Sequence, residues 1–281
     1  MKPGRDAAQR QIATELTALA EPLSGRCREV TSCIYRFDQG KPLEAQGSCV
    51  LLELGEGRFL ISAAHVLDDR RQHRLVIPTG TKLAGLQGQE VVRVFATAAR
   101  TDAEDYVDVG VVRLGPDLQA AIPAASFLRW AELDHAPRVP TGDAFCLVGY
   151  PLTKQRRALR GTELTAYAYQ MAARECPAAV YASTGRNPDH SLMLGFDKRR
   201  MWGPEGVREM PDLTGASGCG VWRFGPSLRT ATAPPRLAGI AVEWYPKVRK
   251  PYILATRISI VIAALVEHYP DVERVVRSLA R

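Results

Sequence analysis

The most informative segment of this chain is Asp212-Leu-Thr-Gly-Ala-Ser-Gly-Cys-Gly-Val221, which places Ser217 in a glycine-rich turn. Gly215 and Gly218 have no Cβ, so the backbone can turn tightly there and adopt positive φ. Such a turn can direct the N–H groups of Gly215 and Ser217 toward one point, the arrangement that stabilises the oxyanion of acyl transfer. The segment therefore predicts a nucleophilic serine beside an oxyanion hole.

Two further segments carry the groups that a serine nucleophile needs. In residues 57–65 an apolar strand pattern ends in Ser-Ala-Ala and then His65, and in residues 107–114 Asp108 stands at the head of a β-branched strand. A serine hydroxyl reacts when a base takes its proton, and that base needs a third group to fix its tautomer. We therefore predict a catalytic triad of His65, Asp108 and Ser217.

The sequence leaves other readings of these residues open. Asp102 and Asp105 compete with Asp108, but only Asp108 is followed directly by an apolar strand that would bury its carboxylate next to an imidazole. Ser217 also reads as an ordinary turn serine and His65 as a core histidine. The chain order His, Asp, Ser differs from the Ser, Asp, His order of α/β-hydrolases, so that fold is disfavoured.

At these positions the chain resembles the trypsin-like (chymotrypsin-fold) serine proteases, in the style of stand-alone bacterial intracellular peptidase domains. The resemblance is carried by Ser62-Ala-Ala-His65, Asp108-Val-Gly-Val-Val and Gly215-Ala-Ser217-Gly, and by Gly142-Asp-Ala-Phe-Cys-Leu-Val-Gly-Tyr-Pro151, which looks like the opening strand of the family's second barrel. It implies an all-β fold of two six-stranded antiparallel barrels and a serine endopeptidase that hydrolyses protein substrates. No cofactor and no metal are implied.

The resemblance also suggests where substrate would bind. Leu237-Ala-Gly-Ile-Ala-Val242 looks like the strand that lines the substrate cleft. The candidate substrate-binding residues are Asp212, Val242, Glu243 and Trp244. The two acids would favour Lys or Arg at the cleaved position, although they read equally well as exposed loop acids, and Trp244 reads as a packing residue.

One departure from the family pattern bears on activity. Ala216 stands where secreted zymogen proteases carry an acid that pairs with the newly cut N-terminus, and stress-type bacterial relatives also lack that acid. We therefore expect an activating partner or effector, docking on the terminal helices, to set the loop of residues 207–216 in a bacterial stress or defence assembly.

Cys219 is a weak alternative nucleophile, because viral cysteine proteases of this fold have glycine two residues earlier. A silent binding or scaffold module is the alternative function.

Four parts are expected along the chain: an N-terminal amphipathic helix (1–25), a first β-barrel with His65 and Asp108 (26–140), a second β-barrel with Ser217 (141–257) and a C-terminal helical tail (258–281). Short β-like runs separated by turn signals favour barrels or a sandwich. The expected strands are 32–37, 48–54, 59–62, 74–77, 91–96, 109–114, 144–148, 165–171, 191–194, 220–224 and 237–242. The tail pattern is helical over 258–268, stops at Pro270 and resumes over 271–279.

Composition and charge set the remaining expectations. The chain has 281 residues, 46% of them hydrophobic and 24% charged, which is typical of a globular protein. The longest apolar run, 258–266, is too short to cross a bilayer, and the N-terminus has no signal-peptide core, so we expect a cytoplasmic protein without membrane contact. The six cysteines lack metal-type spacing and are expected as reduced thiols, with Cys49 and Cys146 buried in strands. The net charge of +7 comes with no nucleic-acid motif, so nucleic acid is not an expected partner.

Overall fold

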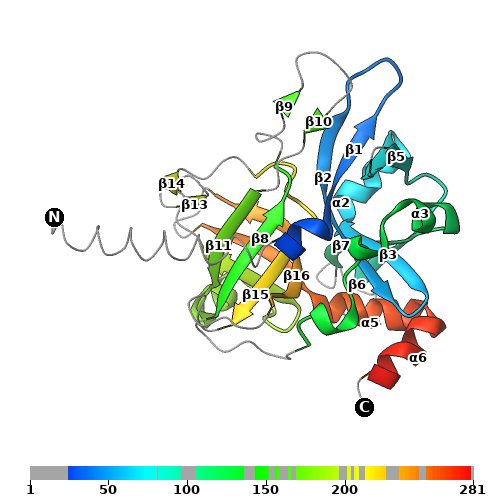
Figure 1. The fold of residues 1–281 in the computed structure, drawn as a ribbon. Helices are drawn as coiled ribbons and strands as arrows, with labels where there is room; N and C mark the ends of the chain where they lie inside the picture. The colour runs from blue at the N-terminus through cyan, green and yellow to red at the C-terminus, as the bar shows by residue number, and fades with distance from the viewer. Residues whose placement is uncertain are drawn as a thin grey trace.

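The computed structural model describes residues 25–80, 82–95, 106–135, 143–151, 156–157, 164–165, 169–195, 201–203, 206–208, 213–225, 234–246 and 251–279. The described chain is mostly β, with a seven-stranded sheet beside a closed six-stranded barrel (Figure 1). The expected N-terminal helix (1–25) lies outside the described residues except for residue 25, which begins a separate short helical segment over 25–29. The expected boundary between residues 140 and 141 also lies outside them.

The first half of the chain forms an antiparallel sheet in the order β5-β4-β1-β2-β3-β7-β6. Its strands are β1 (Thr31–Phe37), β2 (Glu44–Leu54), β3 (Gly57–Ala63), β4 (Arg74–Thr79), β5 (Lys82–Gly85), β6 (Glu90–Phe95) and β7 (Tyr106–Arg113). The middle of β2, and most of β3, is buried on both faces, as expected of apolar runs without strict alternation.

This sheet differs from the expected six-stranded barrel. It has seven strands, and its edge strands β5 and β6 are not joined by a ladder among the described residues. The reason lies in β5, which spans only four residues, with Lys82 and Leu83 exposed. Its sequence has little apolar side chain to bury, so it adds an edge to β4, from the pair Thr79–Lys82 to the pair Val76–Gly85, but does not close the sheet onto β6.

The second half forms the closed antiparallel barrel β11-β12-β17-β16-β15-β8, as expected for this half of the chain. Its strands are β8 (Ala144–Gly149), β11 (Tyr169–Glu175), β12 (Ser191–Gly195), β15 (Gly220–Gly225), β16 (Arg236–Tyr245) and β17 (Tyr252–Arg257). The strand expected over 165–171 is shifted: Thr165 belongs to a small sheet of β9 (Arg156–Arg157) and β10 (Leu164–Thr165), and β11 begins at Tyr169. A second small sheet pairs β13 (Met201–Gly203) with β14 (Gly206–Arg208).

Helices are short except at the C-terminus. They are α2 (Ala64–Asp68), α3 (Pro116–Ala121), α4 (Ala178–Thr184), α5 (Ile258–His268) and α6 (Pro270–Leu279), with 3-10 turns at Asp69–Arg71, Ala124–Ser126 and Trp130–Glu132. The expected break at Pro270 is confirmed, because proline lacks the N–H that would continue α5 but suits the first turn of α6. No described helix combines the length and the apolar character needed to cross a membrane.

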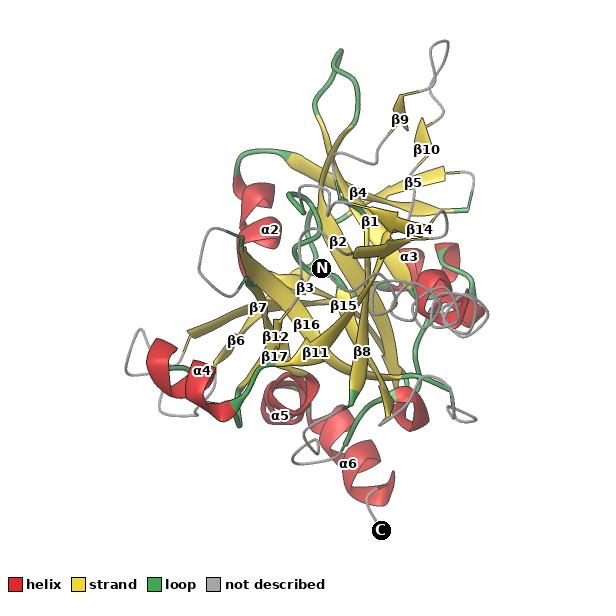
Figure 2. Ribbon diagram, turned by 90° about the vertical axis from the view of Figure 1, so that its left-hand side faces the viewer, coloured by secondary structure: helices red, strands yellow, loops and turns green. Residues whose placement is uncertain are grey.

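Helix α5 contacts strands of both sheets, β6 of the first and β16 and β17 of the barrel (Figure 2). Its residues Ile258, Val261 and Leu265 are fully buried or nearly so. Helix α6 is tied to the first sheet, because Asp271 forms an ion pair of 2.7 Å with Arg113 of β7. The C-terminal helices therefore close one end of the protein and hold its two halves together.

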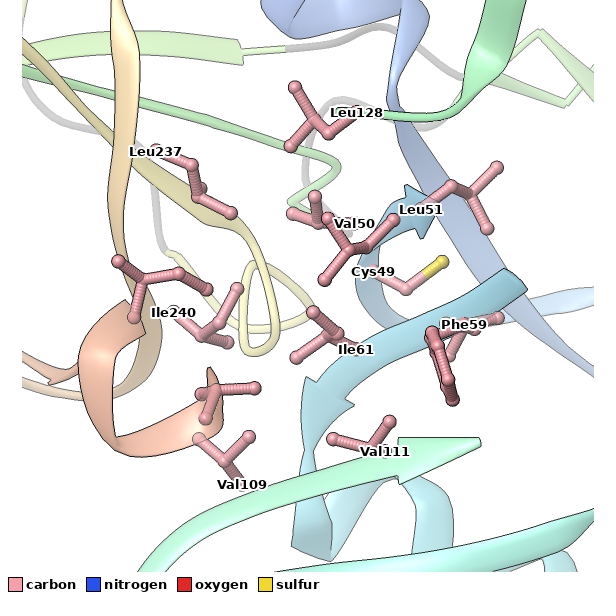
Figure 3. Close-up of a cluster of buried hydrophobic side chains, with 14 of the residues drawn as sticks. Cys49, Val50, Leu51, Phe59, Ile61, Val109, Val111, Leu128, Leu237 and Ile240 are labelled. Carbon is pink, nitrogen blue, oxygen red and sulfur yellow. The ribbon is translucent and has the colours of Figure 1, made fainter. Parts of the chain in front are cut away.

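An apolar seam joins the first sheet to the barrel. Leu237 and Ile240 of β16 face Val50, Ile61 and Val109 of the first sheet, and all of them belong to one buried cluster (Figure 3). Strand β16 also lies against β3 and β7 along this seam. Because packed interiors resist small shifts, the seam fixes β3 and β7 relative to β15 and β16. These are the strands that border the candidate site.

Candidate active site

His65 lies where β3 ends and α2 begins. Ala63 and Ala64 are buried, and the segment turns close to β7, since a Cβ added to Gly110 would lie 3.5 Å from the Cα of Ala64 and 2.8 Å from Leu67 Cδ1. Val66 and Leu67 point into the core, so the helical turn presents the His65 side chain outward, with 53% of it exposed. The small residues before His65 therefore allow this close approach.

Asp108 holds His65 at two points. Its Oδ2 lies 2.7 Å from His65 Nδ1, and its Oδ1 accepts the backbone N–H of His65 at 3.1 Å. Because an ionised carboxylate only accepts hydrogen bonds, Nδ1 carries the proton and the lone pair of neutral His65 is on Nε2. Asp108 has φ of +48°, a left-handed conformation that Asp tolerates better than most residues. Asp102 and Asp105, the competing acids, lie outside the described residues.

The environment of His65 favours its charged form. The hydrogen bond to Asp108 raises the pKa of His65 above its ordinary value of 6.5, burial opposes the shift, and the charges of Asp108, Glu243 and Asp68 add to it. Glu243 comes from β16, on the opposite side of the seam from Asp108. The electrostatic field at His65 is therefore set by both halves of the protein.

Ser217 lies in a double turn between residues 213 and 219. Ala216 N–H donates to Leu213 O at 2.8 Å, and Cys219 N–H donates to Ala216 O at 3.0 Å. The third residue of each turn is a glycine with positive φ, +86° at Gly215 and +88° at Gly218. This is the backbone geometry of type II turns, which require glycine at that place. The glycine spacing noted in the sequence thus has a direct conformational cause.

The turn is wedged against the segment that leads to His65. A Cβ added to Gly218 would lie 2.0 Å from Ser48 O, 2.2 Å from Ser62 Oγ and 3.1 Å from the backbone N of Ala63. On the other side, Gly218 N–H donates to Ala241 O of β16 at 2.7 Å. Gly218 is therefore packed beside Ala63, at the junction of β2, β3 and β16.

The structure brings these segments together without joining the Ser217 and His65 side chains. Within the described part of the chain, the Ser217 hydroxyl makes no hydrogen bond, and none links it to His65 Nε2. Ser217 is only partly buried. Hydrogen bonds between a nucleophile and its base are often long in the absence of substrate and shorten when substrate binds.

Two N–H groups of the turn are unused. Among the described residues, neither Gly215 N–H nor Ser217 N–H has a hydrogen-bond acceptor, although their neighbours Ala216, Gly218 and Cys219 all donate. Backbone N–H groups are nearly always paired when buried, so two free donors in one turn mark a place where an acceptor can bind. Gly215 and Ser217 are the residues that the sequence predicts for this role.

The candidate substrate residues of β16 differ in their surroundings. Val242 is buried at a break in the β16–β17 register, Glu243 is exposed, and Trp244 is half-buried against the barrel core. Glu243 accepts a short hydrogen bond from the Tyr245 hydroxyl, which orients its carboxylate. Asp212 lies outside the described residues.

Cys219 is poorly suited to be a nucleophile. Its side chain is 1% exposed, and burial raises the pKa of its thiol to about 12, with a smaller contribution from Cys146. The thiolate is the reactive form, so little of it exists near neutral pH. Cys49 and Cys146 are buried within strands, as predicted, and none of the six cysteines forms a disulfide.

The sequence reasoning missed Ser48 and Ser62. Both are fully buried, and Ser62 Oγ donates to Ser48 O at 2.7 Å directly beside Gly218. A polar residue at a fully buried strand position is the only local signal that would single them out. The chain matches no protein-family model and no curated protein.

Proposed function

We propose that this protein is a serine endopeptidase of the trypsin-like kind, with Ser217 as nucleophile, His65 as general base and Asp108 as the group that orients His65. The observation that carries the proposal is the 2.7 Å contact between His65 Nδ1 and Asp108 Oδ2, beside the turn that contains Ser217. The closed barrel and the sheet next to it support a chymotrypsin-like arrangement, with base and acid on one half and nucleophile on the other.

The chemistry follows from the proton positions. Because Nδ1–H is bonded to Asp108, the free lone pair of neutral His65 is on Nε2, which accepts the Ser217 proton as the hydroxyl oxygen attacks the scissile carbonyl. The resulting imidazolium is stabilised by the negative charge of Asp108. It then gives its proton to the leaving amine, and water repeats the cycle on the acyl-enzyme.

The oxyanion formed in each half-reaction needs donors that are already in place. The free N–H groups of Gly215 and Ser217 fill this role in the proposal. Removing one such donor typically lowers kcat by about 10²–10³-fold. The conformation of this turn therefore matters for the rate.

We further propose that the substrate is a polypeptide that lies along β16 and carries a basic side chain near Glu243. Glu243 is exposed, and its charge acts on His65, so a Lys or Arg bound there would lie close to the reacting groups. Regulation by a partner in a bacterial stress or defence assembly stays a prediction.

A silent binding module is the second candidate, and one observation favours it: the described structure contains no hydrogen bond between Ser217 and His65. The two candidates differ in the reactivity of Ser217. A module without an activated serine would bind peptides without forming a covalent bond to an electrophile.

A fluorophosphonate probe tests the proposal, because it reacts with serines that an adjacent base has activated. We expect the wild-type chain to be labelled and the Ser217→Ala variant to fall to background. Ser183→Ala is the matched control, since Ser183 is exposed on α4 and donates only to Val180 O. Labelling that survives in Ser217→Ala would assign the nucleophile elsewhere, and an unlabelled wild type would favour the silent module.

A further inference from the structure

Ser48 occupies a central place beneath the candidate oxyanion turn. It lies in β2, is 0% exposed, and is the partner of Cys33 in β1. Its backbone N–H donates to Ser217 O at 2.8 Å, and its backbone O accepts the Ser62 hydroxyl at 2.7 Å. One residue of the first sheet thus contacts the Ser217 turn and the strand that leads to His65.

The direction of the Ser48 hydroxyl is fixed by its partners. Tyr150 N–H can only donate, and it donates to Ser48 Oγ at 2.9 Å. A hydroxyl has a single proton, and Gly215 O, at 3.2 Å, can only accept it. Ser48 Oγ therefore accepts from the end of β8 and donates into the turn, and both partners would be left unpaired without it.

This bond acts on the peptide plane between the two candidate oxyanion donors. The plane of residues 215 and 216 is held at its carbonyl by Ser48 Oγ and at its N–H by Leu213 O. The carbonyl of Ser217, two residues after Gly215, accepts the backbone N–H of Ser48. With these planes fixed, the N–H groups of Gly215 and Ser217 on either side have little freedom to rotate away.

Apart from Ser48, the turn is held by backbone hydrogen bonds and by the buried side chains of Leu213 and Ala216. Ala216, at its centre, carries no polar side chain. We propose that Ser48 is a positioning residue that holds the oxyanion-binding turn in its competent conformation. The inference rests on the proposed peptidase function. Ser48 does not contact the reacting atoms and acts only through Gly215 and Ser217.

The test compares Ser48→Ala with wild type in peptide hydrolysis and in the rate of fluorophosphonate labelling. A displacement of about 1 Å at a reacting centre can lower the rate by about 10²-fold. We expect kcat and the labelling rate to fall by about 10- to 100-fold, with KM nearly unchanged. The acid limb of the pH profile should stay in place, because His65 and Asp108 are untouched.

Thr31→Val is the matched control for buried hydroxyl loss. Thr31 is 4% exposed in β1, and its hydroxyl donates to Cys27 O at 2.6 Å, outside the turn. We expect it to lower thermal stability about as much as Ser48→Ala does and to keep wild-type kcat. Equal losses of kcat in the two variants would show that Ser48 contributes only stability and would overturn the inference.

Ser48→Cys provides a second variant in case Ser48→Ala does not fold. It keeps the shape of the side chain and a weak donor, so we expect an intermediate kcat in a stably folded protein. Wild-type kcat in Ser48→Cys and in Ser48→Ala would contradict the positioning role. The peptidase proposal fails separately, because it fails only if the wild-type chain itself is neither labelled nor active.

Discussion

Two acidic side chains set the orientation and the pKa of the His65 imidazole. Asp108 orients the ring and raises its pKa through their hydrogen bond, while Glu243 adds negative charge from β16. A base must be neutral to accept a proton, so a raised pKa moves the active form to higher pH. If His65 acts as the proposed base, we therefore expect activity to fall in mildly acidic solution.

Glu243→Gln tests this electrostatic contribution. Removing the charge should lower the pKa of His65, so the acid limb of kcat/KM should move to lower pH while the plateau stays within about threefold for a neutral peptide. For a peptide with Lys or Arg near Glu243, kcat/KM should fall about 10-fold or more. Both profiles are measured from pH 5 to 9, the range that the direction of the shift makes relevant.

Glu273→Gln is the matched control, because Glu273 lies on α6 and pairs with Arg277. Its acid limb should coincide with that of wild type. An acid limb in Glu243→Gln that moves to higher pH, or does not move, would contradict a role of Glu243 near His65.

Strands and turns show which parts of the structure local sequence can predict. The apolar run after Asp108 singles out this acid among three, and Pro270 marks the break between α5 and α6. The contact of Ser48 with Gly215 joins residues 167 positions apart, so no local pattern contains it. Strand β17 is also missed: its six residues are all buried, so they lack alternation, and the strand runs directly into the apolar helix α5 with no turn residue between them.

The fit of the Ser217 turn predicts the effect of Gly218→Ala. A Cβ there would overlap Ser48 O at 2.0 Å and Ser62 Oγ at 2.2 Å, so the turn must move away from β2 and β3. We expect kcat to fall by about 10²-fold or more, and the free energy of unfolding to fall by more than the 1–2 kcal/mol that left-handed backbone alone costs.

Gly185→Ala separates backbone strain from the clash. Gly185 ends α4 with φ of +67° and has no atom within 4 Å of an added Cβ. We expect a loss of about 1–2 kcal/mol in urea denaturation with unchanged kcat. If Gly218→Ala behaved like Gly185→Ala in both measurements, the close approach of the turn to β3 would not matter for activity.

The two halves of the protein meet at the seam, and the candidate site straddles it. His65 and Asp108 come from the first half of the chain, whereas Ser217 and Glu243 come from the second half. Helix α5 spans both halves and has its apolar side chains buried there. The packing of this seam therefore sets the position of His65 relative to Ser217.

Ile240→Ala tests whether the seam supports the site. Ile240 is 0% exposed in β16, between Val50, Ile61 and Val109 (Figure 3). Truncating a buried Ile leaves a cavity and typically costs about 2–5 kcal/mol, which urea denaturation would measure. Because the cavity lies between the halves, we expect the fluorophosphonate labelling rate to fall about 10-fold under conditions where the variant is still folded.

Leu83→Ala, which truncates a side chain that is 45% exposed on β5, should change neither quantity appreciably. A destabilised Ile240→Ala variant that is labelled at the wild-type rate would show that each half holds its own part of the site and that the seam serves stability alone.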